Sequence, residues 1–598
     1  MTMVRGVCRL LCFAAALTAW SIVNSGAHAQ TSIWISDSLT KARRDATPGT
    51  DVSLRLYAAR NEFVSFQVHL KPASAPVQMS VTVGDFVNRQ TSDKIAAASS
   101  VTLYREAYLD ITQASDANGA VGPTADPLIP ALDRYTGEAR NAFPVNVPVG
   151  QTQSAWIDVL VPATAPAGVY SASITVKNGS TTLARLPVTL VVWAFTLPST
   201  ASLRSAFGSS WAGMCSAAYG GYANCGHYPG SGGSADKAIE LINQALATRL
   251  LDHRITNSSP VYYGPPTGDW SHFDATYGAL LNGSAPTLLR GAKVTTMQYW
   301  SPSYQIVAGD ITNWVNHFSA AGWLDRLFQY TCDEPPTGCT FAQAKTNEAK
   351  VHAASPLMKT LVTTDIAQGR QNGLLPNLNI FTPIVSAMEP QGGTNQRASY
   401  NGWLRGVDKH LWWYQACPQH GSCTNGVQGP ASSTWPSYMI DATPVRNRVF
   451  QWLAFLDHIE GELYYALDYC WYNAAPQCGG SDPWTSVYAF GGNGDGTLIY
   501  PGTTDRIGGA TPIALPSVRL KHIRDGMQDY EYLNALSQAG YEGYAKAIAH
   551  RFITNASTFN NDPAAMRAAR ISLGARLNQL AVAGQLGQPY CGTGPCKP

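Results

Sequence analysis

The segment Leu327-Phe-Gln-Tyr-Thr-Cys-Asp-Glu-Pro-Pro336 decides how the central part of this chain folds. It begins as a short apolar run of strand length and ends in two acidic residues and two prolines. A helical pattern then extends over Thr340–Ala353. A strand that leads directly into a helix is the repeating unit of folds built on a parallel sheet.

The same unit recurs on both sides of this segment. The expected strands are Ser205–Trp211, Pro260–Tyr263, Val294–Trp300, Leu327–Asp333, Lys359–Thr364, Leu378–Pro383, His410–Tyr414 and Gly461–Leu467. The clearest helical stretches between them are Ala235–Leu251, Ile311–Ala321, Thr340–Ala353 and Val445–His458. Eight such units predict a parallel (β/α)8 barrel, a TIM-like fold, over residues 199–490. An open doubly wound sheet is the alternative, but no Gly-x-Gly-x-x-Gly follows the first strand.

Different patterns flank the expected barrel. Residues 30–198 contain short alternating runs rich in β-branched residues, such as Glu62–Leu70 and Val169–Val176, which predict an antiparallel β-sandwich that ends at Pro198. Residues 491–598 begin with a glycine-rich hairpin at Gly491–Pro501 and continue as helix over Ser517–Val582. We expect this C-terminal region to pack on the barrel, and the sandwich to be a scaffold.

The N-terminal residues 1–29 have the pattern of a secretory signal peptide. Arg5 and Arg9 precede an apolar run over Leu10–Val23, and the small-residue site Ala27–Ala29 follows. Cleavage there would leave a chain in which no run reaches the length of about 18 apolar residues that a membrane span needs. We therefore expect a secreted protein, periplasmic or extracellular, with no membrane association after cleavage.

The cysteines agree with export. Two lie in the expected signal peptide, and the other ten form five close pairs: Cys215/Cys225, Cys332/Cys339, Cys417/Cys423, Cys470/Cys478 and Cys591/Cys596. An even number in local pairs predicts disulfides. No Cys-x-x-Cys, mixed Cys/His knuckle or His-Glu-x-x-His is present, so we expect no metal and no cofactor.

The charge composition excludes one class of partner. The chain has 41 Lys and Arg residues against 39 Asp and Glu, and charged residues make up 13% of it. No basic block forms the electrostatic surface that nucleic acid requires. The sequence also contains 16 Trp and 28 Tyr, and 45% of its residues are apolar, so we expect it to fold around a hydrophobic core.

The acidic pair Asp333 and Glu334 ends the fourth expected strand, where a barrel builds its active site. The alternative is a pair that only complements the N-terminus of the following helix. Ordinary retaining glycosidases hold two carboxyl groups about 5–5.5 Å apart, usually on different strands. Adjacent carboxylates suit a sugar that carries its own nucleophile, a 2-acetamido carbonyl. One carboxylate then stabilises the amide while its neighbour acts as acid and base.

The segment Tyr330–Pro335 resembles the Asp-Glu motif of glycoside hydrolase family 123, the β-N-acetylgalactosaminidases, and their uncharacterised relatives. Further segments are similar to the family's Arg/Trp helix, eighth strand, glycine hairpin and terminal helix: Asp441–Trp452, Gly461–Tyr465, Gly494–Gly502 and Arg519–Leu533. The resemblance implies that Asp333 polarises the 2-acetamido group and that Glu334 is the general acid/base.

Aromatic residues near the expected strand ends are candidates for a sugar-binding platform. Trp413 and Tyr414 close the seventh strand and Trp471 follows the eighth, so these three are the first candidates, with Trp211 and Trp300 as further ones. The alternative for each is a place in the core.

These observations predict an exported glycoside hydrolase acting with retention on an oligosaccharide, polysaccharide or glycoconjugate that carries a 2-acetamido sugar. One rival is a glycosidase on a sugar without the acetamide, in which Glu334 pairs with a remote carboxylate. Asp365, Glu389 and Asp468 are the strand-end candidates for that partner. A second rival is a non-catalytic carbohydrate-binding scaffold.

Overall fold

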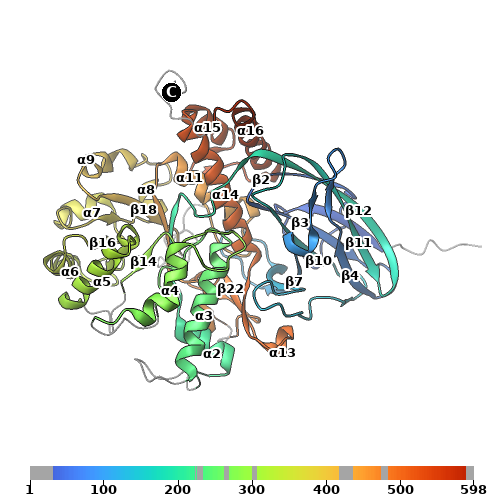
Figure 1. Ribbon diagram of the computed structural model, residues 1–598, viewed down its shortest axis with the longest axis horizontal. Coiled ribbons are helices and arrows are strands. Elements are labelled where there is room, and N and C mark those ends of the chain that lie inside the picture. Colours follow the sequence, from blue (N-terminus) through green and yellow to red (C-terminus); the bar gives the residue numbers. More distant parts are fainter. Residues whose placement is uncertain are drawn as a thin grey trace, which may run out of the picture.

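The computed structural model describes residues 31–221, 224, 234–261, 268–299, 306–416, 435–472, 478 and 482–586. An N-terminal domain of β-sheets lies beside a larger domain in which helices surround a parallel sheet (Figure 1). The expected signal peptide lies outside the described residues.

The N-terminal domain is a sandwich of two sheets. The first sheet has the order β1 (Ser32–Asp37), β3 (Glu62–Lys71), β10 (Gln153–Val161), β7 (Val101–Ile111) and β8 (Gly122–Pro130). The second has the order β2 (Leu54–Arg60), β12 (Thr181–Thr196), β11 (Gly168–Asn178), β4 (Val77–Val83) and β9 (Val145–Val147), with β5 (Phe86–Asn88) and β6 (Lys94–Ile95) beside β11. Alternate side chains of both sheets, such as Phe66, Ile157 and Ile174, form a single buried core between them.

One pairing in the sandwich differs from the predicted antiparallel pattern. Strand β2 pairs with β12 in parallel, with Val188 opposite Leu54, whereas the other strand pairs of the two sheets are antiparallel. Strand β12 is 16 residues long, and its last residues extend past the sandwich. Trp193 and Phe195 there belong to the hydrophobic core of the larger domain, so the end of this strand joins the two domains.

The larger domain contains a nearly closed parallel barrel of seven strands. Their order is β13 (Arg204–Phe207), β19 (Gly461–Tyr464), β18 (His410–Tyr414), β17 (Ile380–Phe381), β16 (Lys359–Val362), β15 (Leu327–Cys332) and β14 (Met297–Gln298), and each neighbouring pair is parallel. Side chains from six of these strands meet in one buried cluster inside the sheet: Ala206, Phe328, Leu361, Ile380, Trp412, Tyr414 and Leu463. A filled interior of this kind is typical of parallel barrels.

The expected strand at Pro260–Tyr263 lies partly outside the described residues, and its described residues, Pro260 and Val261, are not in a strand. The chain contacts the end strands of the sheet at an earlier segment. Phe207 of β13 donates its backbone N–H to Thr256 and accepts one from Ser258, and Gln298 of β14 donates to Ser258 in turn. The segment Thr256–Ser258 therefore bridges the two end strands without forming regular strand geometry. Polar residues make it invisible to a search for apolar runs.

Helices cover the outside of the barrel (Figure 1). After the first strands they are α2 (Trp211–Tyr219), α3 (Ser234–Leu251), α4 (Ser271–Asn282), α5 (Ala308–Ala320) and α6 (Phe341–Ala354). The later ones are shorter: α7 (Ile366–Gln371), α8 (Val385–Met388), α9 (Asn401–Leu404), α10 (Pro444–Arg448), α11 (Phe450–Leu456) and α12 (Tyr469–Tyr472). The expected helix Val445–His458 is thus divided in two at Val449.

The C-terminal region contacts helices of the larger domain, but it does not form the expected single hairpin at Gly491–Pro501 or one continuous helix over Ser517–Val582. It contains the hairpins β20 (Tyr488–Ala489) with β21 (Gly492–Asn493) and β22 (Ile499–Gly502) with β23 (Ile513–Pro516), then α14 (Val518–Gln538), α15 (Glu542–Ala549) and α16 (Pro563–Val582). Helix α14 contacts α10 and α11 on one side and strands β3 and β8 of the sandwich on the other. It is therefore the central element of the domain interface.

Helix α14 carries buried charges that pair with the sandwich. Arg519 binds Asp126 of β8 at 2.8 Å, and Arg524 and Lys521 both bind Asp158 of β10, at 2.8 Å and 2.9 Å. Burial alone would raise the pKa of Asp158, but Arg524 and Lys521 hold it well below its usual range. Each pair spans the domain interface, and replacing one member would leave the other charge buried without its partner.

We expect Arg524→Met to destabilise the protein by about 3–5 kcal/mol, the usual effect of removing one member of a buried pair. The guanidinium also donates to Ser65 at 2.6 Å, so the substitution strips donors from two sandwich residues. Denaturant unfolding measures the change. Arg551→Met, at an exposed arginine, is the control and should leave the midpoint within experimental error. Equal, small shifts for both variants would contradict a structural role for this pair.

Two of the predicted disulfides are confirmed within the described residues. They are Cys332–Cys339 and Cys470–Cys478, which close chain separations of 7 and 8 residues. Cys215 is also disulfide-bonded, and its expected partner Cys225 lies outside the described residues, as do the pairs Cys417/Cys423 and Cys591/Cys596. In the same ranges no helix has the length and apolar character of a membrane span.

Candidate active site

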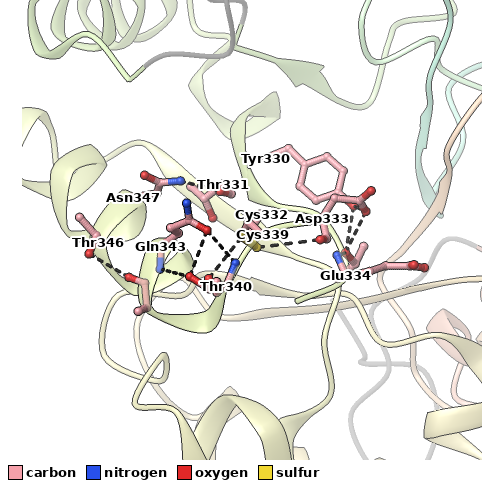
Figure 2. The surroundings of a disulfide bond; sticks show 12 residues. Tyr330, Thr331, Cys332, Asp333, Glu334, Cys339, Thr340, Gln343, Thr346 and Asn347 are labelled. Atoms are coloured by element: carbon pink, nitrogen blue, oxygen red, sulfur yellow. Dashed lines mark hydrogen bonds between the residues drawn. A yellow bond between two sulfur atoms is a disulfide. The ribbon is translucent and has the colours of Figure 1, made fainter. Parts of the chain in front are cut away.

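The acidic pair lies at the carboxyl end of β15, as the sequence predicts. Asp333 follows directly after the strand and is exposed, and Glu334 is half-buried. Both carboxylates point away from the Cys332–Cys339 disulfide, toward the same side of the loop (Figure 2). Glu334 has a φ of +40°, in the left-handed region that side chains other than glycine rarely occupy. Strain of this kind is concentrated at functional sites.

The following helix does not use the pair for its N-terminus. Helix α6 begins at Phe341, and Thr340 and Gln343 form a reciprocal capping box there. The first turn contains no acidic residue. The alternative explanation of the pair as helix-capping charges is therefore unnecessary, since the helix has its own cap.

Asp333 is held by two hydroxyl groups. The hydroxyl of Tyr330 donates to Oδ1 of Asp333 at 2.5 Å (Figure 2). The hydroxyl of Thr363, just beyond β16, donates to the same oxygen at 3.2 Å. Thr363 also accepts the backbone N–H of Glu334 at 2.6 Å, so one threonine positions both acidic residues. Burial, together with the charge of Asp333, raises the pKa of Tyr330 well above its usual value, so Tyr330 remains a donor.

Glu334 is held by a different tyrosine. The hydroxyl of Tyr414, the last residue of β18, donates to Glu334 Oε1. The ring of Tyr414 is 7% exposed and lies in the interior cluster of the barrel. Tyr414 was expected to stack on a sugar, but its buried ring offers no open face, and its contact is with the catalytic candidate itself.

Two of the remaining aromatic candidates, Trp413 and Trp471, have described side chains, and both lie in the core. Trp413 is fully buried outside the barrel wall and stacks on Phe450 at 4.7 Å, so its place is in the core. Trp471 is 6% exposed and donates its indole N–H to the carbonyl of Ile499. Trp211 begins helix α2 rather than ending a strand, and Trp300 lies outside the described residues. Successive side chains of a strand point to opposite faces of the sheet. Trp412 and Tyr414 face the interior of the barrel, so Trp413 between them faces outward.

The proposed remote carboxylates all have structural hydrogen bonds. Asp365 caps helix α7 by accepting from the N–H groups of Ala367 and Gln368. Both oxygens of Asp468 accept from the backbone of Ser210 at 3.0 Å, and burial raises the pKa of Asp468 to about 8. The two oxygens of Glu389 accept from Asn395 and from the backbone of Ala556, in the C-terminal region.

Sequence reasoning missed two groups at this face of the barrel. Thr363 is the last residue but one of the expected strand Lys359–Thr364, and a single hydroxyl at that position has no sequence pattern that indicates a role. Tyr465 and Phe490 are large apolar residues with 37% and 40% exposure, and their rings contact each other beyond the carboxyl end of β19. Phe490 has a φ of +48° at the tip of the β20–β21 hairpin.

Gly338 offers a test of the loop geometry. A Cβ at this position would lie 2.3 Å from the carbonyl oxygen of Asp333, so the residue must be glycine for the turn to close. We expect Gly338→Ala to displace the pair and lower kcat/KM by about 10- to 100-fold, as misplacement of catalytic groups does. Gly309→Ala in helix α5, where a Cβ meets nothing within 4 Å, is the control. Equal activity of the two variants would show that the loop tolerates displacement.

Comparisons with known protein families match both domains of the chain. The model described as the catalytic domain of glycoside hydrolase 123 matches residues 288–536, and the glycoside hydrolase 123 N-terminal domain matches residues 34–178. Together the two matches span about two thirds of the chain. No curated protein matches it.

Solved structures support the fold. A family 123 glycoside hydrolase from Clostridium perfringens, studied for glycolipid glycan hydrolysis, is similar with a TM-score of 0.63 and 13% identity, covering 93% of this chain and 99% of that one. A family 39 glycoside hydrolase from Bacteroides cellulosilyticus is much less similar, with a TM-score of 0.27 and 10% identity over 82% of this chain and 83% of that one. By both of its matched domains and by its fold, the chain belongs to glycoside hydrolase family 123 and is a glycosidase.

Proposed function

We propose that this glycosidase cleaves a β-linked 2-acetamido sugar, an N-acetylgalactosaminide, with retention and through substrate assistance. The observation that supports it most is the pair itself: Asp333 and Glu334 are adjacent, and different hydroxyl groups hold their carboxylates. Two neighbouring acids with separate partners can take separate roles. The Clostridium perfringens enzyme is described as acting on glycolipid glycans, which makes a glycoconjugate a suitable substrate class here as well.

In the proposed first step the acetamido carbonyl oxygen attacks the anomeric carbon while the glycosidic bond breaks. Glu334 gives its proton to the departing oxygen, and the carboxylate of Asp333 accepts the acetamido N–H and balances the positive charge that develops on nitrogen. In the second step Glu334 takes a proton from water, which attacks the anomeric carbon and reopens the oxazolinium ring. Two inversions at one carbon give net retention.

The surroundings of the other carboxylates favour this scheme over a two-carboxylate mechanism. A nucleophile must reach the anomeric carbon. Asp468 is fully buried, and both oxygens of Glu389 are engaged with structural partners. Asp365 uses Oδ1 to cap a helix. None of the three is prepared for attack, whereas a substrate with an acetamide would bring its nucleophile with it.

We also infer the location of the protein and the closure of its barrel. The chain is exported, which its N-terminal pattern and its disulfides support. Thr256–Ser258 acts as the second strand of a (β/α)8 barrel, since it hydrogen-bonds both end strands of the sheet.

The direct test of the substrate class is a panel of aryl β-glycosides. Each sugar is presented with a 2-acetamido group and with a 2-hydroxyl, on the same leaving group. We expect turnover of the 2-acetamidogalactoside and at least a hundredfold lower kcat/KM for its 2-hydroxyl counterpart, since the latter lacks the nucleophile. Comparable turnover of the two substrates would contradict the proposal and favour a glycosidase that acts on sugars without the acetamide.

A further inference from the structure

We infer that Tyr414 is a positioning residue that determines which oxygen of Glu334 carries the transferable proton. The inference rests on the proposed role of Glu334 as the general acid, but not on the identity of the sugar. It replaces the expectation that Tyr414 binds substrate. Strand β18 then contributes a hydrogen-bond donor to Glu334, in the loop that follows β15.

The hydrogen bond has a fixed direction. Within the described residues, Glu334 Oε1 is the acceptor for the Tyr414 hydroxyl, and no other acceptor contacts that hydroxyl. Burial and the nearby charge of Glu334 raise the pKa of Tyr414 well above its usual value, so the phenol stays protonated. An oxygen that accepts this bond is disfavoured as the site of protonation. The proton of the acid form is therefore directed to Oε2.

No cation shares this task. In the described part of the chain, the partners of the Asp333 and Glu334 carboxylates are the hydroxyl groups of Tyr330, Thr363 and Tyr414, and no Lys, Arg or His side chain is among them. The titratable groups that face Glu334 are Asp333 on its own loop, Tyr414 on β18 and, through Asp333, Tyr330 on β15. Thr363 supplies a neutral hydroxyl from beyond β16. Each carboxylate thus accepts from one tyrosine, and Asp333 also accepts from the hydroxyl of Thr363.

The arrangement divides the two tyrosines by function. Tyr330 donates to Asp333, which must stay ionised to balance a positive charge. Tyr414 donates to Glu334, which must alternate between the acid and base forms. A neutral donor favours the carboxylate without holding it as firmly as a cation would, so Glu334 can still be protonated.

We expect Tyr414→Phe to move the alkaline limb of the kcat/KM profile to higher pH by about one unit, because the carboxylate form of Glu334 loses its donor. The sign follows from the lost bond: removing stabilisation of the charged form raises the pKa of the acid. At neutral pH we expect kcat/KM for a poor leaving group to fall about tenfold, because the carboxyl group of Glu334 is no longer held in the orientation that protonates the departing oxygen.

Three variants serve as comparisons. Tyr330→Phe removes the same hydroxyl beside Asp333 and should leave the alkaline limb in place. Tyr170→Phe removes a buried hydroxyl in the sandwich, which donates to the carbonyl of Pro166, and should leave the profile unchanged. Difluorotyrosine at position 414, a stronger donor of nearly the same shape, should move the limb in the opposite direction, to lower pH.

The result that overturns the inference is an alkaline limb that neither Tyr414→Phe nor the fluorinated residue moves, with folding confirmed by circular dichroism. Equal shifts for Tyr330→Phe and Tyr414→Phe would also overturn it. The experiment uses whichever aryl glycoside the enzyme turns over, so a failure of the N-acetylgalactosaminide proposal does not affect it. If Glu334→Gln retains the same limb, Glu334 is not the acid, and the proposed function fails instead.

Discussion

Glu334→Gln is expected to lower kcat/KM by about a thousandfold on glycosides with poor leaving groups, and by about tenfold on activated aryl glycosides. The reason is that an activated phenolate departs with little protonation, while an alkoxide requires a proton from Glu334. Glutamine keeps the shape of the side chain and can still accept from Tyr414, so the change isolates proton transfer. Steady-state kinetics on a series of leaving groups measures the difference.

Added azide provides the control for the second step. If base assistance to water has become limiting in this variant, azide needs no deprotonation and should partly restore turnover of the activated substrate. Equal losses on all leaving groups, with no effect of azide, would assign Glu334 to binding or folding.

Asp333→Asn is expected to lower kcat by about a hundredfold or more, which corresponds to about 2.7 kcal/mol of barrier. A neutral amide cannot balance the positive charge that forms on the acetamido nitrogen. Tyr330 and Thr363 can still contact the substituted side chain, so we expect the fold to be retained. Single-turnover measurements with the 2-acetamido substrate give the rate of the chemical step.

Asp365→Asn is the matched control for this substitution. It makes the same chemical change beyond the neighbouring strand, at a residue whose carboxylate caps helix α7. Asparagine caps helices about as well as aspartate, so stability and activity should both be retained. A large loss of activity in Asp365→Asn, with a small loss in Asp333→Asn, would favour Asp365 as the nucleophile of an ordinary retaining enzyme.

The sequence predicts the parts of this fold that depend on local pattern. Strand β18 occupies His410–Tyr414 as expected, and the acidic pair lies at a carboxyl end of the parallel sheet because the strand-to-helix transition marks that end. The segment Thr256–Ser258 escapes prediction because it is polar and contacts its neighbours through irregular hydrogen bonds. The parallel pairing of β2 with β12 depends on contacts between distant strands, which periodicity does not encode.

Side-chain roles are harder to predict than positions. Trp413 and Tyr414 are neighbours at one strand end, yet one packs outside the barrel wall and the other reaches Glu334 from its interior. The alternation of side chains along a strand places the two residues on opposite faces of the sheet. The sequence does not show which of these faces is the interior of the barrel. The charged residues of α14 would ordinarily be assigned to a solvated surface. Their burial follows from partners on the sandwich more than 300 positions away.

The measurement that tests the substrate-assisted mechanism most directly compares two mechanism-specific ligands on the wild-type enzyme. A thiazoline mimic of the oxazoline intermediate reports on acetamide participation, and a 2-deoxy-2-fluoro glycoside traps an enzyme carboxylate that attacks carbon. We predict competitive inhibition by the thiazoline well below the Michaelis constant of the substrate, weakened in Asp333→Asn, with no covalent adduct detected by mass spectrometry. Failure of the thiazoline to bind, together with a fluoroglycosyl adduct on Asp365, Glu389 or Asp468, would contradict the mechanism.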